Sequence, residues 1–423
     1  MATSYYVRAG AAGSSNGTSW ANAWPNVSSI SWSSIAPGDT IWIAGGSYGT
    51  MTIGKSGTAD TATGRIFIKR ATGAAHGSDT GWSAGFDSLV TVAGMTWSAL
   101  NVGSYVTVDG QVDAGILIPH GDGSGNTSVS FDRGNSYVTL RNLDLAGPSD
   151  LHSHHHTGDD RSLDLTAWNG SSYDVIDHLT VQYVRFHGTC TAIWNMRTSN
   201  AIFEYNQIYN VFDDNGAVCH PDVFVTSGTT NLTFRFNKIY QYEDEGIMAL
   251  NGDNGTMYIY GNLWYAQTNT NARIMETQMG ANGPAYFYNN TIDGISLGVM
   301  TANGGNWAAG SQGRNNIWWN TGCNGLSDTD YDFTSSGSCS GTHSIHSGSN
   351  PFGDLLNHDY SLISTVGSTF PRGKGVDLGA PYDVDANGTA RGASGAWDIG
   401  AYAFYVLGAA LPAPPQGVTV TAK

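Results

Sequence analysis

Residues 203–210 read FEYNQIYN, and residues 234–241 read FRFNKIYQ, so one short phrase returns farther along the chain. In both copies, apolar and polar residues alternate, an asparagine follows, and a second alternating run begins. Alternation with a period of two is typical of a half-buried β-strand, and asparagine is typical of a tight turn. The phrase therefore predicts two short strands joined by a turn.

Related phrases recur over much of the chain. When their fourth position is taken as the register, the successive gaps are 43, 22, 31, 24, 28 and 26 residues. The phrases are VTLRNL at 138, VQYVRF at 181, FEYNQI at 203, FRFNKI at 234, YIYGNL at 258, YFYNNT at 286 and a trace in GRNNIW at 313, with IFIKRA at 66 and YVTVDG at 105 as earlier members. A unit this short cannot bury its own apolar face, so the units must stack.

The repeat predicts an all-β fold, a single-stranded parallel β-helix built from coils of 22 to 31 residues between residues 138 and 320. Because side-chain amides on adjacent coils can hydrogen-bond along the stack, we expect Asn206, Asn237 and Asn289 to form a ladder at one corner.

The composition supports this class and excludes others. The chain has 423 residues, 56 of them glycine, and only 12% are charged, which suits an all-β protein with many turns. A net charge of −16 argues against nucleic acid or an anionic membrane as partner. No apolar run is long enough to span a bilayer, and the N-terminus lacks the layout of a signal peptide.

Four further segments carry a family resemblance. SYYVRAGAAGSSNGTSWANAW (4–24), APGDTIWIAGGSYGTMTI (36–53) and GRIFIKRATG (64–73) resemble the opening coils of right-handed parallel β-helix proteins of the pectate-lyase-like superfamily. DIGAYAF (398–404) resembles their closing strand. The resemblance implies the fold strongly and the function weakly, because lyases, hydrolases, epimerases, phage tailspikes and adhesins share it.

The expected organisation has three parts. Residues 1–60 form an N-terminal cap and the first coil, residues 61–405 form the β-helix, and residues 406–423 form a Pro-rich tail. The four cysteines, Cys190, Cys219, Cys323 and Cys339, allow two disulfides or buried thiols, and Cys323 and Cys339 flank a Gly/Ser-rich loop that a disulfide would staple.

The stretch from 217 to 252, AVCHPDVFVTSGTTNLTFRFNKIYQYEDEGIMALNG, holds the candidate site. Aligning coils on the apolar pair that begins the next strand puts acids, His220 and Arg273 on neighbouring coils. Aligning them on the preceding Asn puts Asp213 and Asp214 one coil from Asp244 and Glu245. Because parallel strands lie about 4.8 Å apart, either alignment gathers these groups on one side of the solenoid.

Three interpretations stay open for this cluster. The first is catalysis, in which crowded carboxyls separate their pKa values and one acts as a general acid; its residues are Asp214, His220, Asp222, Asp244, Glu245 and Arg273. In this interpretation the side chains of all of these except Asp244 are expected to point outward into one depression. The second is a Ca²⁺ site, with His220 or Arg273 facing a uronate; its ligands are Asp213, Asp214, Asp244 and Glu245. The third is a solvated surface.

The lyase and hydrolase patterns of the superfamily are incomplete here. Alginate- and chondroitin-lyase-type β-helices resemble residues 237–252 in an Asn turn followed by an acidic run, but they place a Lys on the next strand. Here that strand carries Asn251 instead, and Lys238 lies on the turn. The polygalacturonase-like pattern is represented only by the Asp pair in FDDNG at 212.

Two other features attract attention. The run HSHHH, with His152, His154, His155 and His156, could bind a divalent metal with Asp159 or Asp160, although no distant fixed ligand is evident. Trp194, Trp264, Trp318 and Trp319 could stack on sugars, but core packing is the more frequent role.

Together these features predict an extracellular or virion-associated β-helix protein that contacts, and could cleave, surface polysaccharide. A tail spike, fibre or decoration protein, in contact with other virion proteins or as a homotrimer, is the favoured version. The alternatives are a secreted polysaccharide lyase or glycoside hydrolase, and a bacterial adhesin.

Overall fold

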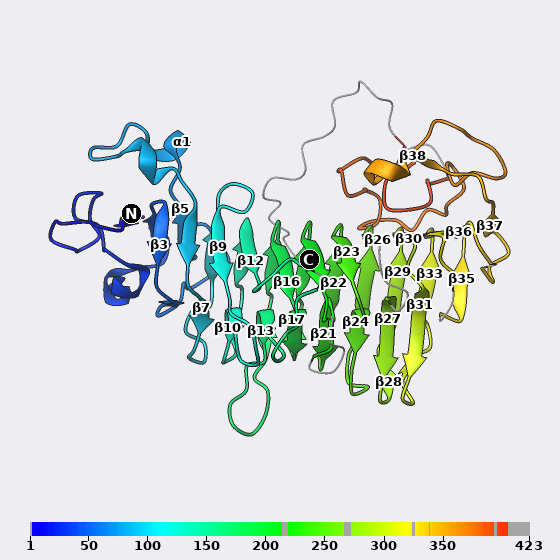
Figure 1. Cartoon of the computed structure of the whole chain (residues 1–423), viewed down its shortest axis with the longest axis horizontal. Helices are drawn as coiled ribbons and strands as arrows, with labels where there is room; N and C mark the ends of the chain where they lie inside the picture. The colour runs from blue at the N-terminus through cyan, green and yellow to red at the C-terminus, as the bar shows by residue number, and fades with distance from the viewer. Residues whose placement is uncertain are drawn as a thin grey trace.

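The computed structural model describes residues 2–151, 153–213, 219–265, 272–323, 326–337, 339–392 and 396–404. Its strands follow one another along a single long axis from the N-terminal end to the C-terminal end (Figure 1). They form three long sheets in which every neighbouring pair is parallel, and consecutive strands of the chain move from one sheet to the next. This topology is a parallel β-helix, so the predicted fold is confirmed.

The first two sheets, A and B, meet at a tight corner. Sheet A contains β1 (Ser4–Val7), β2 (Thr40–Ile43), β5 (Ile66–Arg70), β8 (Val106–Asp109), β11 (Thr139–Arg141), β15 (Thr180–Gln182), β19 (Ile202–Glu204), β22 (Leu232–Arg235), β25 (Met257–Tyr260), β29 (Ala285–Tyr288), β33 (Gln312–Arg314) and β35 (Asp328–Asp330). Sheet B contains β3 (Gly46–Tyr48), β6 (Val90–Val92), β9 (Ile116–Pro119), β12 (Leu143–Ala146), β16 (Arg185–Thr189), β20 (Gln207–Val211), β23 (Lys238–Tyr242), β26 (Leu263–Tyr265), β30 (Thr291–Asp293), β34 (Ile317–Trp319), β36 (Phe333–Thr334) and β37 (Ile345–His346).

The third sheet, C, completes each coil. It contains β4 (Met51–Thr52), β7 (Met95–Trp97), β10 (Thr127–Phe131), β13 (Arg161–Leu165), β17 (Thr191–Met196), β21 (Phe224–Ser227), β24 (Glu245–Ala249), β27 (Arg273–Gln278) and β31 (Leu297–Ala302). Three two-strand pairs lie beside the main sheets: β14 (Ile176–Asp177) with β18 (Thr198–Ser199), β28 (Ala281–Asn282) with β32 (Asn306–Trp307), and β38 (Phe352–Asp354) with β39 (Asp359–Leu362).

Helices are few and short in the described residues. The α-helix α1 spans Gly73–His76, and the 3₁₀ turns span Val27–Ser29, Trp32–Ser34, Ala84–Phe86 and Leu355–Asn357. None of these helices is long and apolar enough to cross a membrane.

The core is a column of apolar side chains inside the three sheets. On sheet A, the inward positions Val181, Phe203, Phe234, Ile259 and Phe287 follow one another coil by coil, and each is fully buried. Paired positions in this sheet lie 22 to 31 residues apart from β15 to β33, as the repeat predicts. The step from β11 to β15 is longer because its coil carries the histidine-rich insertion.

The corner between sheets A and B carries the asparagine ladder. The side-chain amides of Asn206, Asn237, Asn262, Asn290 and Asn316 each donate to the side chain one coil ahead, at 3.0 to 3.1 Å, and the series ends on Asp332. Each amide also donates to a backbone carbonyl, so the ladder is satisfied although it is buried.

The predicted ladder is correct for Asn206 and Asn237 and wrong for Asn289. Asn289 adopts a left-handed conformation with φ of 53°, as do Tyr205 and Phe236 in the preceding coils, with φ of 57° and 58°. That residue makes the turn, and the next residue points inward. The ladder member is therefore Asn290, one residue later.

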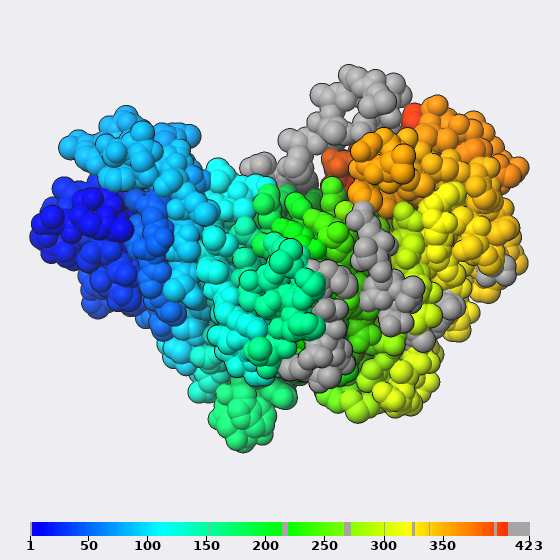
Figure 2. All heavy atoms as spheres, viewed as in Figure 1, coloured from blue at the N-terminus to red at the C-terminus, as the bar shows by residue number. Residues whose placement is uncertain are grey.

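The C-terminal part of the chain folds back over sheet B of the last coils. The orange segment that contains β38 lies over β26, β30 and β36 (Figure 1). Phe352, Tyr360 and Ile399 from this segment form one apolar cluster with Ile317 and Phe333 of sheet B. In Figure 2, the blue N-terminal part and the orange C-terminal part both rise above the coils between them.

Candidate functional site

The candidate site lies at the corner where sheet B passes into sheet C. Asp222 precedes β21, Glu245 begins β24, and Arg273 begins β27. Glu245 pairs with Arg273 across the ladder, and Asp222 occupies the same position one coil earlier, because Phe224 pairs with Ile247. The three residues therefore form one row along the solenoid axis.

Asp222 and Glu245 form a buried carboxyl pair, with 1% and 2% of their surface exposed. The backbone N–H of Glu245 donates to Asp222 Oδ1 at 3.2 Å. Burial, and then the negative charge of its partner, raises the pKa of Asp222 well above its usual range. Burial, with a further contribution from Asp244, also raises the pKa of Glu245. Two such carboxyls hold one proton between them more readily than two separate charges.

One arginine counters several carboxylates here. Arg273 Nη1 donates to Asp244 Oδ1 at 2.7 Å and also to Glu245 Oε1, and its Nε lies 3.4 Å from Glu276 Oε2. Asp244 and Arg273 each keep 26% of the side chain exposed. They are therefore the part of the cluster that a bound molecule can reach.

His220 and Asp213 lie at the border of the cluster. The His220 side chain is 78% exposed, and its Nδ1 lies 3.7 Å from Asp244 Oδ2, which is longer than a hydrogen bond. A disulfide between Cys190 and Cys219 ties the residue before His220 to the preceding coil. Asp213 is 4% exposed, and its Oδ2 accepts from the backbone N–H of Cys219 at 3.4 Å.

Most of the predicted residues lie together in the structure, but two of them are oriented differently from the prediction. Asp222, Asp244, Glu245, Arg273 and His220 meet at this corner, whereas Asp214 lies outside the described residues. The expectation that Asp222 and Glu245 point outward is wrong. Glu245 lies two residues before Ile247, a core residue, and so shares the inward parity of its strand.

Glu276 is a further member of the cluster that the coil alignment did not predict. It is 3% exposed, and it follows Arg273 by three residues on β27. An acid three residues from the arginine in RIMETQ, residues 273–278, was the available signal.

The corner has the donor set for a calcium ion. One carboxylate oxygen each from Asp222, Asp244 and Glu245 lies within 4.8 Å of the others. Glu245 Oε2 is buried without a hydrogen-bond partner. Ca²⁺ takes carboxylate oxygens, so these residues fit it in chemistry, with Asp222 in the place predicted for Asp213 and Asp214.

The other predicted features have separate outcomes. Trp264, Trp318 and Trp319 are buried in the core. Trp194 packs against the Arg161 guanidinium, whose Cζ lies 4.0 Å from the centre of the ring. The four cysteines form two disulfides, Cys190–Cys219 and Cys323–Cys339. Disulfides of this kind are compatible with an extracellular protein.

Two surface depressions lined by described residues lie away from this corner. A depression of about 700 Å³ crosses the outer face of sheet A, and its lining includes Arg65, Arg141, His178 and Tyr258. A second, of about 560 Å³, shares Arg141 with it. Neither lining contains Asp222, Asp244 or Glu245. We place the candidate chemistry at the acidic corner because the buried carboxyl pair with raised pKa values is there.

Comparison with known proteins gives likenesses of architecture. No protein-family model matches the sequence, and no curated protein matches it. Among solved structures, the chain is similar to pectate lyase Pel9A, with 14% identity, a TM-score of 0.45, and 96% of this chain and 98% of that chain covered.

Two further solved structures are similar at comparable levels. A complex of XylC with xylose has 9% identity, a TM-score of 0.44 and coverage of 95% and 98%. A rhamnogalacturonan lyase has 11% identity, a TM-score of 0.38 and coverage of 81% and 84%. At these identities the likeness concerns the fold, and the three all-parallel sheets by themselves make this chain a parallel β-helix.

Proposed function

We propose that this protein binds polysaccharide along the corner between sheets B and C and cleaves it by acid–base chemistry. The observation that carries the proposal is the buried Asp222–Glu245 pair, whose pKa values are raised, next to the more exposed Asp244. A carboxyl that keeps its proton beside one that is ionised is the arrangement that glycoside hydrolysis requires.

In this proposal the residues have separate roles. Asp244, partly exposed and held by Arg273, is the carboxylate nearest to a bound sugar. The pair behind it, Asp222 and Glu245, holds the proton that a leaving glycosidic oxygen needs. Hydrolysis is favoured over β-elimination because the residues that follow, 247–252, contain no lysine to serve as base.

Calcium is an alternative to the proton at this corner, because a bound ion and the shared proton would occupy the same carboxyls. Asp222, Asp244 and Glu245 would hold the ion, since their oxygens converge at this corner. When bound, Ca²⁺ supplies positive charge that keeps these carboxyls ionised and attracts an acidic sugar. Arg273 neutralises part of the same charge in its absence.

The test is a screen of the purified full chain against neutral and anionic polysaccharides. New reducing ends without unsaturated products would support hydrolysis, and unsaturated products would show elimination instead. The Glu245→Gln variant should lose turnover by at least about a hundredfold, in the range of general acid–base catalysis. Asp328→Asn is the control, because it removes a carboxylate paired with Arg314 outside the site. Full activity of Glu245→Gln would refute the proposal.

The depression on sheet A supports a second candidate, non-catalytic glycan binding. Its lining runs across sheet A from Phe67 in β5 to Tyr258 in β25, parallel to the solenoid axis. Thr180, in the middle of this lining, is partly exposed. Thr180→Phe should fill the depression and weaken binding of a glycan that the Glu245→Gln variant still binds.

The virion role stays a prediction from the sequence. A tail spike or fibre with this fold would assemble as a closed symmetric oligomer, usually a trimer. Light scattering of the full chain tests this directly, and a strict monomer at micromolar concentration would argue for the secreted enzyme.

A further inference from the structure

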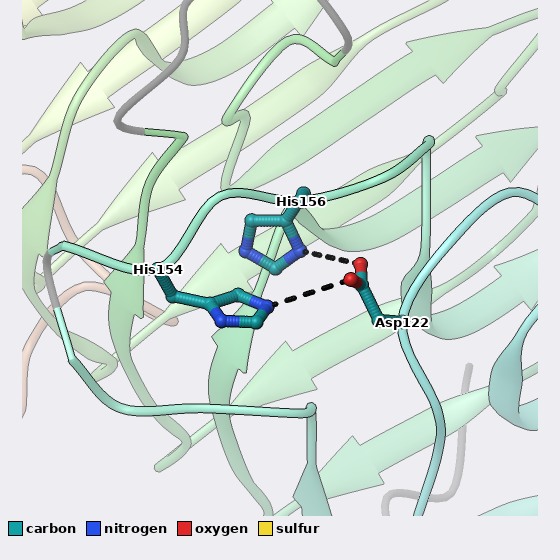
Figure 3. Close-up of side chains that lie close together, drawn as sticks. All are labelled: Asp122, His154 and His156. Atoms are coloured by element: carbon teal, nitrogen blue, oxygen red, sulfur yellow. Dashed lines mark ion pairs between the residues drawn. The ribbon is translucent and has the colours of Figure 1, made fainter.

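A second cluster of titratable groups lies on an earlier part of the same corner. Asp122 follows β9, and His154 and His156 follow β12 in the next coil (Figure 3). His154 Nε2 lies 3.7 Å from Asp122 Oδ2, and His156 Nδ1 lies 3.6 Å from Asp122 Oδ1. Both separations are too long for hydrogen bonds.

These separations suit groups that share a metal ion. With metal–ligand bonds of about 2.0 to 2.1 Å, neighbouring ligands of a tetrahedral Zn²⁺ lie roughly 3.3 Å apart. In Figure 3, both imidazoles turn a ring nitrogen toward the same carboxylate. The three ligand atoms lie within 4.8 Å of one another, and each imidazole is only a few tenths of an ångström farther from Asp122 than two ligands of one ion would be.

The buried side of the cluster is unsatisfied. His156 is 2% exposed, and its Nε2 has no hydrogen-bond partner; the same holds for Nε2 of the neighbouring His120, which is 9% exposed. Asp160, fully buried, lies 2.6 Å from His156 Nδ1. Asp160 contacts the same ring nitrogen that faces Asp122, so it would become a further ligand when an ion replaces the proton that it shares with His156.

The surrounding hydrogen bonds hold the cluster in place. Asp160 Oδ1 accepts from Thr189 Oγ1 at 3.0 Å and from the Cys190 N–H at 3.1 Å. Asp122 Oδ1 accepts from the Thr157 N–H at 3.0 Å, which joins the two turns. Asp122 and His154 each keep 25% of the side chain exposed, so an ion has a way in.

We propose that Asp122, His154 Nε2, His156 Nδ1 and Asp160 bind a divalent transition metal of the zinc class. Two imidazoles select such a metal over Ca²⁺, which prefers oxygen ligands. The bound ion would cross-link two adjacent coils. This metal site is separate from the acidic corner of the proposed function. Arg161, the residue after Asp160, lies three strand spacings along sheet C from Glu245, roughly 14 Å.

The experiment is a calorimetric titration of the chelator-treated full chain with Zn²⁺ alone. We expect one Zn²⁺ per chain and thermal stabilisation on binding. Asp122→Asn should weaken the affinity by at least about tenfold, and His156→Ala by about a hundredfold. Asp122→Asn is the decisive variant, because the amide oxygen can still accept from Thr157, so the turn is kept.

Two histidines serve as controls. His155 belongs to the same run, and His343 is an exposed histidine beside Asp330 on a distant loop. His155→Ala and His343→Ala should retain wild-type affinity, and Co²⁺ in place of Zn²⁺ should give visible bands of four or five ligands. Affinity unchanged by Asp122→Asn, or lost equally with His155→Ala, would show adventitious binding by the histidine run and overturn the proposal.

Discussion

Two carboxyl groups of the acidic corner, Asp222 and Glu245, are kept away from water. Glu245 illustrates the consequence for stability. Burial raises the pKa of Glu245 in the folded chain. The contribution of its protonated form to the free energy of unfolding is therefore fully present below the unfolded pKa and is lost as the pH rises through the folded pKa. The free energy of unfolding should therefore fall between about pH 5 and pH 8.

Glu245→Gln tests this linkage. The variant cannot ionise at position 245, so its melting temperature should fall less over that pH interval than that of the wild type. Asp222 still titrates, which leaves part of the dependence. Asp328→Asn, a change at an exposed carboxylate, should keep the full wild-type fall. Identical pH profiles for all three proteins would contradict a raised pKa at Glu245.

Asp332, at the end of the asparagine ladder, gives a second prediction at this scale. Burial raises its pKa to about 7, although it accepts from the N–H and the side-chain amide of Asn316 at 2.7 and 3.1 Å. Asp332→Asn would continue the ladder with an uncharged amide. We expect a higher melting temperature at about pH 8 and little change near pH 4, where the acid is protonated. A variant less stable than the wild type at pH 8 would refute this.

The sequence predicts which residues belong to the acid cluster better than it predicts how their side chains are oriented. Asp222, Asp244, Glu245 and Arg273 meet as expected, because parallel coils bring equivalent positions within one strand spacing. Their burial could not be predicted, since a shift of one residue in register reverses the face of a strand. Asp122 could not be connected to His156 at all, because the two belong to separate turns and nothing in either segment fixes their distance.

At the scale of the element, the two-residue turn between sheets A and B decides the register. Asn is favoured both in the left-handed turn position and in the ladder. Where two asparagines are adjacent, as at 289–290 and 315–316, composition does not distinguish them. YGNL at 260–263 does, because Gly261 takes the positive φ and leaves Asn262 to the ladder.

Replacing a ladder asparagine should lower the free energy of unfolding more than replacing a turn asparagine beside the ladder. Asn237 donates to Phe203 O and Asn262 Oδ1 and accepts from the N–H and side chain of Asn206, all at 2.9 to 3.0 Å. Asn237→Ala leaves these partners buried and unsatisfied and should cost on the order of 3 kcal/mol. Urea denaturation measures the loss.

Asn289→Ala is the matched control for the ladder. Its side chain donates once, to Tyr382 O at 3.4 Å, and its backbone has φ of 53°. The variant should lose about 1 kcal/mol, mainly from a left-handed alanine. If both variants lose the same free energy, the ladder is not the stabilising element of the corner.

At the scale of the molecule, a solenoid passes stability only from coil to neighbouring coil. The repeat in the sequence predicts this architecture, because each unit is incomplete alone. It does not predict that the C-terminal segment folds back over sheet B. That contact depends on single long-range partners, such as Tyr360 with Asp293 and the Ala401 N–H with Thr291.

The last prediction follows from this locality. Ile399 is fully buried with Ile317 and Phe333, so Ile399→Ala should cost about 3 kcal/mol at that end of the solenoid. Hydrogen exchange should become faster in residues 352–404 and in β30 and β34, and remain unchanged in β5, β8 and β11. Val108→Ala, in the core of β8, should produce the reverse pattern. Because the coils in between would transmit neither change, faster exchange along the whole chain from either variant would show one cooperative unit instead of a solenoid with nearest-neighbour coupling.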